Sequence, residues 1–184
     1  MESAAFDYDL PDHAIAQTPA SPRDSSRLLI ASEPVTHALT RDFPTLLRPG
    51  DVVVLNDTRV LPARMRLAKP TGGQVEVLAL EPRPDGDWAA LVRPSRRVPD
   101  GTRLVTSTGA EVLEVGAATG DGTRVVRPLV PDMEQLLDEL GTVPLPPYIT
   151  EPLGDAERYQ TVYADRASSV AAPTAGLHLT DEVL

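Results

Sequence analysis

The sequence contains no cysteine among its 184 residues. This absence excludes disulfide bonds, thiolate metal sites, iron–sulfur clusters and a cysteine nucleophile at once. Histidine is scarce as well, since His13, His37 and His178 are the only three. They lie too far apart in the sequence to form a local zinc-binding motif. We therefore expect a protein without a metal ion.

Aromatic residues and long apolar runs are also in short supply. Phe, Trp and Tyr together make up 4% of the chain. No apolar stretch approaches the ~20 residues that span a bilayer. The opening MESAAFDYDLPDH is acidic and lacks the basic and apolar regions of a signal peptide. We expect a cytoplasmic protein with no membrane segment.

Positive charge is scarce overall but concentrated in one part of the chain. The formal net charge of −10 argues against binding to a polyanion such as nucleic acid. Residues 1–58 carry 4 basic and 9 acidic side chains, residues 59–104 carry 9 and 5, and residues 105–184 carry 4 and 13. The middle segment is either a surface for an anionic ligand or a solvated strand surface without a binding role.

Short segments in which apolar and polar residues alternate predict a small antiparallel β-barrel between residues 62 and 128. Such alternation, interrupted by turn signals such as Gly72-Gly73, is typical of strands with one buried face. Five or six short strands at this spacing favour a closed barrel. The segments are 63–69, 74–80, 88–94, 102–107, 110–116 and 123–129.

The flanking segments, 1–61 and 129–184, mix strand and helix patterns. Residues 27–32 and 35–40 predict short strands, and residues 42–50 predict a short helix. The apolar run 52–55 does not alternate, so it predicts a central strand that is covered on both faces. The prolines of PLPPYI predict an extended segment.

Two further helices are predicted in the second flank. In 131–141, Asp132 and Gln135 form a plausible capping pair, and Gly141 gives a stop signal. Residues 155–165 predict a second helix that places two tyrosines on one face. The predicted fold is therefore mixed α and β: a discontinuous α/β domain, 1–61 and 129–184, with the barrel inserted at 62–128.

Two stretches carry polar residues that could perform chemistry. The first is Asn56, Asp57, Thr58 and Arg59, which follow the predicted buried strand, where ligand crevices form in open α/β sheets. The alternative is a simple Asn-Asp turn with a local Asp–Arg pair.

The second stretch, SSVAAPTAGLH, is made of small side chains and ends in His178. Small residues let a ligand approach the backbone closely, and a histidine near neutrality can act as an acid or a base. The alternative is a structural histidine at the end of a loop.

Nine strings along nearly the whole chain resemble one family, the S-adenosylmethionine:tRNA ribosyltransferase-isomerases of queuosine biosynthesis. They are FDYDLP, IAQTP, SRLL, GDVVVLNDTRVLPAR, GGQVEVLAL, LVRPSRRV, PLPPYI, ERYQTVYA and SVAAPTAGLH. The resemblance implies a transferase and isomerase that moves the ribosyl group of S-adenosylmethionine onto 7-aminomethyl-7-deazaguanine at the tRNA wobble position. Epoxyqueuosine-tRNA would form, with S-adenosylmethionine as cosubstrate and no metal. Family members run considerably further, so we expect the chain to be the N-terminal portion of a longer, monomeric protein.

The positions of these motifs imply roles for individual residues. His178 is the first choice for acid or base, and Asp57 for base or sulfonium partner. The substrate contacts implied are Asn56, Thr58, Arg59, Arg64, Thr174, Ala175 and Gly176, and the tRNA contacts are Arg93, Arg96 and Arg97.

Two other functions remain open on the sequence alone. The barrel could be a non-catalytic RNA-binding module for which the flanks serve as a scaffold. Alternatively, the protein could transfer a nucleoside or base between small molecules without using tRNA.

Overall fold

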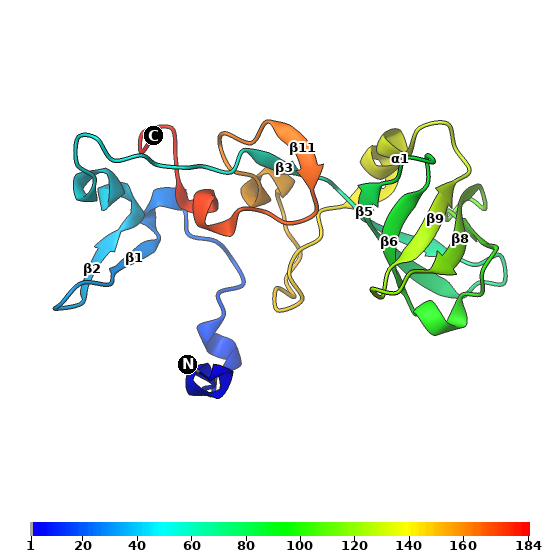
Figure 1. Ribbon diagram of the computed structural model, residues 1–184, viewed down its shortest axis with the longest axis horizontal. Helices are drawn as coiled ribbons and strands as arrows, with labels where there is room; N and C mark the ends of the chain where they lie inside the picture. Colours follow the sequence, from blue (N-terminus) through cyan, green and yellow to red (C-terminus); the bar gives the residue numbers. More distant parts are fainter. Residues whose placement is uncertain (1) are drawn as a thin grey trace. The chain divides into compact units, whose positions relative to one another are not determined.

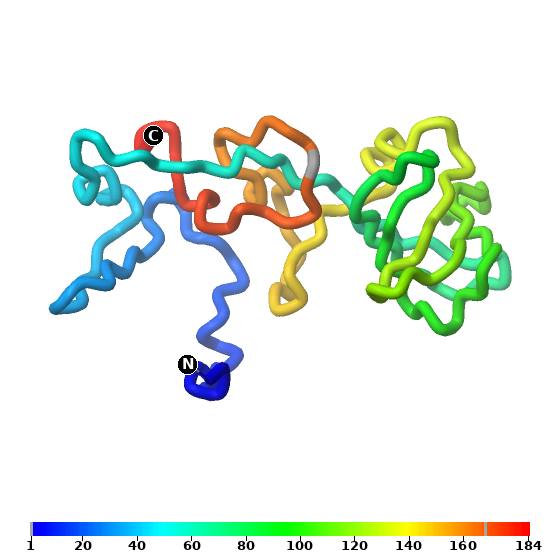
Figure 2. The backbone as a smooth tube through the Cα atoms, viewed as in Figure 1, coloured from blue at the N-terminus to red at the C-terminus, as the bar shows by residue number. Residues whose placement is uncertain are grey.

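The computed structural model describes residues 2–184, apart from the side chain of Ser168. The chain divides into two compact units. The first unit comprises Met1–Leu55, Leu145–Val162 and Thr174–Leu184, and the second comprises Asn56–Pro144 and Tyr163–Pro173. The ribbon and the tube show the course of each (Figures 1 and 2). The limits predicted for the inserted barrel domain, residues 62 and 128, stay a prediction.

The second unit contains a closed antiparallel barrel of six strands, which confirms the predicted barrel (Figure 1). The strands are β4 (Arg64–Ala68), β5 (Gln74–Pro82), β6 (Trp88–Arg93), β7 (Thr102–Val105), β8 (Glu111–Ala118) and β9 (Arg124–Pro128). They pair in the order β4-β5-β6-β9-β8-β7, and the pairing of Ala68 with Val105 closes the ring. Closure leaves none of the six strands as a free edge.

The barrel is filled by the alternate residues that its strands turn inward. In β5, Val75, Val77 and Ala79 are buried while their neighbours are partly exposed. Each fully buried side chain of the Val, Leu or Met type stabilises the fold by about 1.5–3 kcal/mol relative to an exposed one. Helix α1 (Met133–Leu140) adds Met133, Leu136 and Leu137 to the same core.

Helix α1 begins and ends where the sequence predicts. The Asp132 carboxylate accepts hydrogen bonds from the backbone N–H of Glu134 at 2.9 Å and of Gln135 at 3.3 Å. The Gln135 side chain does not complete the capping pair, because it donates to Glu139 at 2.8 Å instead.

A glycine is required at position 141, after the end of α1, because of space and not because of its backbone angle. Its φ of −79° is accessible to any residue. A Cβ placed there, however, would lie 1.7 Å from the Pro62 carbonyl oxygen and 2.3 Å from that of Leu137. After Gly141, strand β10 (Gly141–Thr142) pairs with β4.

The first unit has little regular structure. A hairpin joins β1 (Arg27–Ile30) to β2 (Thr36–Leu39), which confirms both predicted strands. The predicted helix 42–50 is a 3-10 helix, η4 (Thr40–Leu46). The other short 3-10 helices of the chain are η1 (Ser3–Phe6), η2 (Asp12–Ala14), η3 (Arg23–Ser25), η5 (Ser95–Arg97), η6 (Ala156–Tyr159) and η7 (Thr174–His178). Over the described residues, no helix has the length and apolar character that a membrane span requires.

The predicted central strand at 52–55 is wrong. Residues 51–57 form no strand, and the side chains of Val52 and Val54 are 86% and 88% exposed. An apolar run indicates that burial of its side chains would be favourable, but it does not specify which distant segment would pack against them. The strand in this region is β3 (Thr58–Val60), which pairs in parallel with β11 (Arg166–Ser169).

The predicted helix 155–165 is also wrong beyond its first turn. Asp155 does cap a helical turn, since its carboxylate accepts from the Glu157 N–H at 3.0 Å. The turn ends at Tyr159, and the next two residues, Gln160 and Thr161, are both buried. The helical period instead assigns the face with the two tyrosines to the interior, so the burial of these two polar residues does not fit a continuous helix.

Replacing Gly141 with alanine should destabilise the second unit. The added methyl group must displace backbone atoms of Pro62 and Leu137, so we expect a loss of about 2 kcal/mol or more in the free energy of unfolding. Thermal or urea denaturation measures this loss. Gly120→Ala is the matched control, because a Cβ at Gly120 meets nothing within 4 Å. Equal stability of the two variants would contradict the steric account of this glycine.

Candidate functional site

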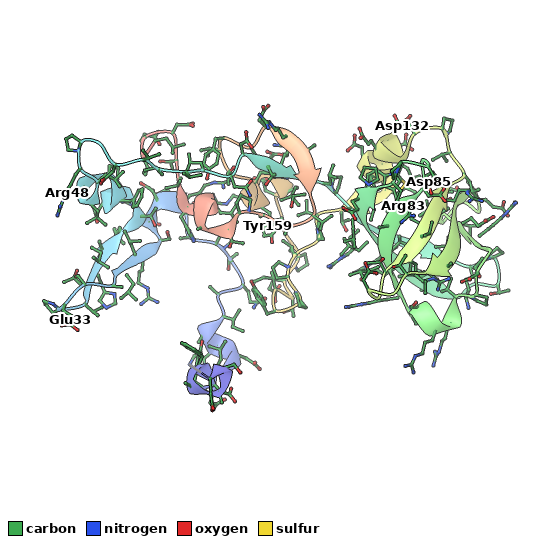
Figure 3. All side chains as sticks on the ribbon, viewed as in Figure 1. Glu33, Arg48, Arg83, Asp85, Asp132 and Tyr159 are labelled. Carbon is green, nitrogen blue, oxygen red and sulfur yellow. The ribbon has the colours of Figure 1, made fainter. Side chains whose placement is uncertain are left out.

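The first unit contains a cavity of about 680 Å³, within the range of small-molecule sites. Three segments line it: residues 16–27, residues 145–159, and Thr174, Leu177 and His178. Tyr159, labelled in Figure 3, ends η6 and lines the cavity together with Tyr148. Two carboxylates, Glu151 and Asp155, also belong to the lining.

The Gln17 side chain joins the first two segments. Its amide nitrogen donates to the Tyr148 carbonyl oxygen at 3.0 Å. Its amide oxygen accepts from the backbone N–H of Thr150 at 2.8 Å, and more weakly from that of Glu151 at 3.4 Å. The side-chain amide thus donates to one backbone group and accepts from others, as the peptide group of a paired β-strand does. This wall of the cavity is therefore fixed by one amide.

The Arg23 guanidinium ties η3 to the other two walls. Its Nη1 donates to the carbonyl oxygen of Gln160 at 2.6 Å and to that of Leu177 at 3.3 Å. Its Nη2 donates to the Glu157 carbonyl oxygen at 2.6 Å. Burial and, next, the charge of Arg158 lower the pKa of Arg23, although a guanidinium stays charged at neutral pH.

His178 ends η7, directly after the Leu177 carbonyl that Arg23 holds. Its imidazole lines the cavity and is exposed, and among the described residues it has no hydrogen-bond partner. Thr174 lines the cavity as well. Gly176 is buried and Ala175 is exposed, and neither belongs to the lining. Of the second predicted stretch, the structure brings Thr174 and His178 to the cavity.

Asn56 to Arg59 belong to the second unit, where they form a turn and the start of β3. The Asn56 side-chain oxygen accepts from the Thr58 N–H at 2.9 Å and from the Thr58 hydroxyl at 2.5 Å. The Asp57 carboxylate lies 3.7 Å from Arg166 Nε, and both side chains are largely exposed. Arg59 lies opposite Ala167 in the β3–β11 pair. This local geometry is the Asn-Asp turn of the alternative interpretation, with Arg166 as the arginine partner.

The predicted tRNA contacts lie on the barrel around one loop. Arg93 ends β6, and Arg96 and Arg97 belong to η5, which follows it. All three side chains are exposed. Lys69 joins them, because its ammonium donates to the Arg97 carbonyl oxygen at 3.2 Å. Arg64 lies in β4, and its backbone carbonyl accepts from the Thr142 hydroxyl at 3.1 Å.

Arg124, which the sequence does not single out, anchors this loop from beneath. Its side chain is 6% exposed. It donates to the carbonyl oxygens of Val98 at 3.0 Å and Gly116 at 2.6 Å, and it pairs with the Asp100 carboxylate at 2.7 Å. A weaker bond reaches the Ser95 carbonyl at the start of η5. The buried charge is therefore fully paired, and the loop that carries Arg96 and Arg97 is held in place.

Two residues that shape the first-unit cavity, Gln17 and Arg23, are likewise not indicated by the sequence pattern. Gln17 lies inside the string IAQTP, and Arg23 lies three residues before the string SRLL, yet nothing in the local pattern marks either residue. Among the described residues, no group of three or more His, Asp or Glu side chains is placed to hold a metal ion. The expectation of a metal-free protein stays a prediction.

Comparison with known proteins gives a consistent set of relatives. S-adenosylmethionine:tRNA ribosyltransferase-isomerase of Thermus thermophilus is 47% identical over 191 residues, which cover 98% of this chain and 55% of the relative. The protein of the same name from Gloeobacter violaceus is 49% identical over 183 residues, covering 98% and 52%. The chain spans about half the length of the curated relatives it matches.

A solved structure and a family model complete the comparison. The crystal structure of S-adenosylmethionine tRNA ribosyltransferase from Thermotoga maritima is 32% identical, with a TM-score of 0.38, covering 97% of this chain and 51% of that one. The model of the family described as queuosine biosynthesis protein matches residues 3–184. A match over that range confirms the resemblance read from the sequence, and the chain belongs to the queuosine biosynthesis protein family.

Proposed function

We propose that this chain takes part in transferring and isomerising the ribosyl group of S-adenosylmethionine onto 7-aminomethyl-7-deazaguanine at the wobble position of tRNA. The products are epoxyqueuosine-tRNA and the adenine and methionine released from S-adenosylmethionine. The names of relatives that are 47% and 49% identical support the reaction. The observation that carries the proposal is the cavity of the first unit, where His178 faces a space of ligand size between walls pinned by Gln17 and Arg23.

The lining suits a cationic nucleoside. A sulfonium is positively charged, and the carboxylates of Glu151 and Asp155 favour a cation in the cavity. Tyr148 is largely exposed at the lining and offers a flat ring against which an adenine can stack. Thr174 offers a hydroxyl for the ribose.

The reaction needs proton transfer at two points. The sulfonium acidifies the adjacent 5′ carbon, so one group removes that proton, and another assists the departure of adenine. The neutral aminomethyl group of the deazaguanine is the nucleophile. His178 is assigned to one proton transfer, because its imidazole is available at the cavity and is held next to the Leu177 carbonyl. On motif position alone, Asp57 is proposed as a base or sulfonium partner, with Asn56, Thr58, Arg59 and Arg64 as substrate contacts; these five residues belong to the second unit. Ala175 and Gly176 are proposed as backbone support for the His178 loop.

The barrel is proposed to hold the tRNA backbone. Arg93, Arg96 and Arg97 are exposed within one short segment, and Arg124 fixes that segment from below. Phosphate contacts of this kind contribute affinity and orientation and read no sequence. Base recognition is left to the site that holds the deazaguanine.

Replacing His178 with alanine should lower turnover by about 10² or more, since a positioned acid or base contributes that much. Adenine release from S-adenosylmethionine, in the complete protein with tRNA bearing the deazaguanine base, is the measurement. His37→Ala is the control, because His37 is exposed on β2 and does not line the cavity. Near-normal turnover of the His178 variant would remove the assignment. Binding of tRNA without adenine release would favour the non-catalytic module, and release without tRNA the small-molecule enzyme.

Replacing Arg23 with lysine should lower kcat/KM by about tenfold to a hundredfold while preserving the charge. A single ammonium lacks the planar fork with which Arg23 reaches the Glu157 and Gln160 carbonyls on one segment and the Leu177 carbonyl on another, so the His178 loop loses its anchor. Steady-state kinetics on the complete protein measures the effect. Arg41→Lys is the control, since the Arg41 side chain is 46% exposed and its recorded ion pair, with Asp24, is long at 3.7 Å. The same small effect from both variants would show that Arg23 does not position the site.

Neutralising Arg96 and Arg97 with glutamine should flatten the salt dependence of tRNA binding by roughly one to two units of slope, because each phosphate contact releases about one counterion. Binding is measured over a range of salt concentrations. The double variant Arg41→Gln and Arg48→Gln changes the net charge equally but alters residues of the first unit. If both double variants lower the slope equally, the effect comes from net charge in general, and the arginines of the barrel have no specific role in tRNA binding.

A further inference from the structure

The string SRLL, residues 26–29, carries part of the family resemblance but has no role in the reaction proposed above. Its arginine, Arg27, is the first residue of β1 and lines the first-unit cavity. Arg158, Glu151 and Asp155 belong to the same lining, which therefore holds two cations and two carboxylates. With His178 neutral the formal charge of the lining is zero, and a ligand that carries charges of both signs fits it.

Of the two guanidinium groups, only that of Arg27 is left available for a ligand. Arg158 is half-buried, and its Nη2 donates to the Ala20 carbonyl oxygen at 2.6 Å. The Arg27 side chain is exposed at the cavity, and among the described residues it has neither a hydrogen bond nor an ion pair. An arginine that faces a cavity without a protein partner favours an anionic group of the ligand.

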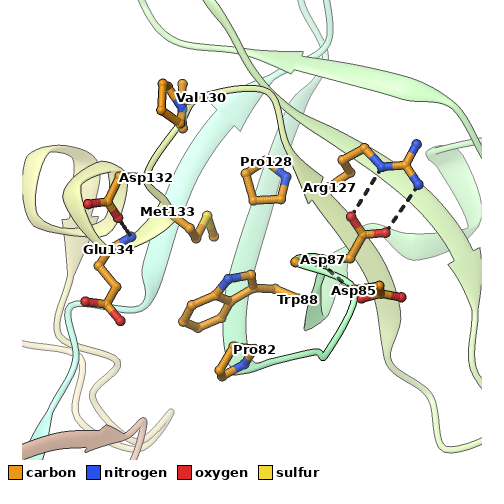
Figure 4. Close-up of a pocket in the computed structure, with 12 residues that line it drawn as sticks. Pro82, Asp85, Asp87, Trp88, Arg127, Pro128, Val130, Asp132, Met133 and Glu134 are labelled. Carbon is orange, nitrogen blue, oxygen red and sulfur yellow. Dashed lines mark hydrogen bonds and ion pairs between the residues drawn. The ribbon is translucent and has the colours of Figure 1, made fainter.

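The cavity of the second unit shows what an arginine does when a carboxylate lies close to it. There, Arg127 has its Nε 3.2 Å and its Nη2 3.3 Å from the two Asp87 oxygens (Figure 4). In the first-unit cavity, over the described residues, no such pair joins Arg27 to Glu151 or to Asp155. The available cation and the carboxylates of this lining are therefore separated, as the opposite charges of an extended dipolar ligand are.

The backbone next to Arg27 is held in place. The Thr40 N–H donates to the Ser26 carbonyl oxygen at 2.9 Å, and the hydroxyls of Ser26 and Thr40 lie 2.7 Å apart. Thr40 is buried, and Arg27 itself lies opposite Leu39 in the β1–β2 hairpin. Ordering a guanidinium on a fixed backbone costs less entropy than ordering one on a mobile loop, so this position suits a binding residue.

We propose that Arg27 binds the carboxylate of the amino-acid part of S-adenosylmethionine, an inference that rests on the proposed function for the identity of the ligand. A guanidinium donates two parallel hydrogen bonds to a carboxylate, and this pairing is stronger than one between neutral groups. The carboxylate is the only anionic group of S-adenosylmethionine, since its sulfonium and its ammonium are cations. Arg27 therefore selects the amino-acid end, and Glu151 and Asp155 remain for the cationic groups.

A tRNA phosphate is the other anion to which an available arginine could bind. In this cavity a polyanion would meet the carboxylates of Glu151 and Asp155, which repel it. S-adenosylmethionine has a net positive charge, so it gains from both carboxylates as well as from Arg27. The charges of the lining thus favour the carboxylate of the small molecule.

Decarboxylated S-adenosylmethionine tests the inference, because it keeps the adenosine, the sulfonium and the ammonium and lacks only the carboxylate. Calorimetry measures the binding of both compounds to the 184-residue chain without turnover. We expect S-adenosylmethionine to bind about tenfold to a hundredfold more tightly, which is the range for hydrogen bonds between charged groups. Equal affinities of the two compounds, or no binding of either, would overturn the inference.

Matched variants locate this preference. Arg27→Gln should bind the two compounds with similar affinity, and Arg27→Lys, which keeps the charge but loses the paired hydrogen bonds, should retain a preference of about threefold to tenfold. Arg48→Gln is the control: Arg48, labelled in Figure 3, is exposed in the same unit and does not line the cavity. Thermal denaturation should give the same midpoint for Arg27→Gln as for the unchanged chain, because the removed group has no partner among the described residues. A full preference in Arg27→Gln would overturn the inference.

Turnover separates a binding role of Arg27 from other roles. In the complete protein with tRNA bearing the deazaguanine base, Arg27→Gln should raise KM for S-adenosylmethionine about tenfold to a hundredfold and leave kcat within about threefold, because the carboxylate is remote from the reacting atoms. A lower kcat with an unchanged KM would overturn the assignment. A flatter salt dependence of tRNA binding with unchanged affinity for S-adenosylmethionine would mark a phosphate contact and overturn it as well. Absence of adenine release, with the preference between the two compounds intact, would instead refute the ribosyl transfer and leave the Arg27 contact standing.

Discussion

The guanidinium of Arg23, bonded to three backbone carbonyls, is the interaction on which the first unit depends most. In the described part of that unit the buried residues are Thr40, Gln160, Thr161 and Gly176, so no large apolar side chain is fully buried there. A segment without an apolar core needs other long-range contacts to offset the entropy of ordering its backbone. Bonds from side chains to distant backbone groups supply them, and Arg23, Gln17 and Arg158 make the most far-reaching ones.

The barrel unit relies on the opposite principle. Its core consists of side chains such as Met65, Leu104 and Leu113, which are fully buried on alternating strand positions. The buried guanidinium of Arg124 is paired with carbonyl and carboxylate partners. The hydrophobic core holds the scaffold rigid, and one buried guanidinium fixes the loop that the scaffold presents.

This difference explains which parts of the fold the sequence predicts. The six barrel strands and the Asp132 cap of α1 follow from local signals, a period of two and a capping residue, and the structure confirms both. The run Val52 to Leu55 fails, because its burial depends on a covering segment that the run itself does not specify. The helix at 155–165 fails because Gln160 and Thr161 are buried against the helical period.

The candidate site shows the same division. His178 and Thr174 come from a motif and do line the cavity. Gln17 and Arg23 do not emerge from the sequence, because their partners are backbone groups 131 to 154 residues away. A carbonyl oxygen is present at every residue, so a side chain that binds one leaves no trace in the residue type of its partner. Such contacts become visible only when the chain is folded.

The preference for arginine over lysine in this chain has a physical reason at some positions and none at others. At positions 23 and 124 a planar group with five donors satisfies several carbonyls at once, which an ammonium on a flexible stem cannot reproduce. At Arg96 and Arg97 the side chains are exposed and bind no other side chain among the described residues, so any cation would satisfy the structure. A specific need for guanidinium groups at these two positions would therefore come from the geometry of a ligand. Phosphate oxygens accept two parallel hydrogen bonds from a guanidinium, so a phosphate distinguishes an arginine from a lysine.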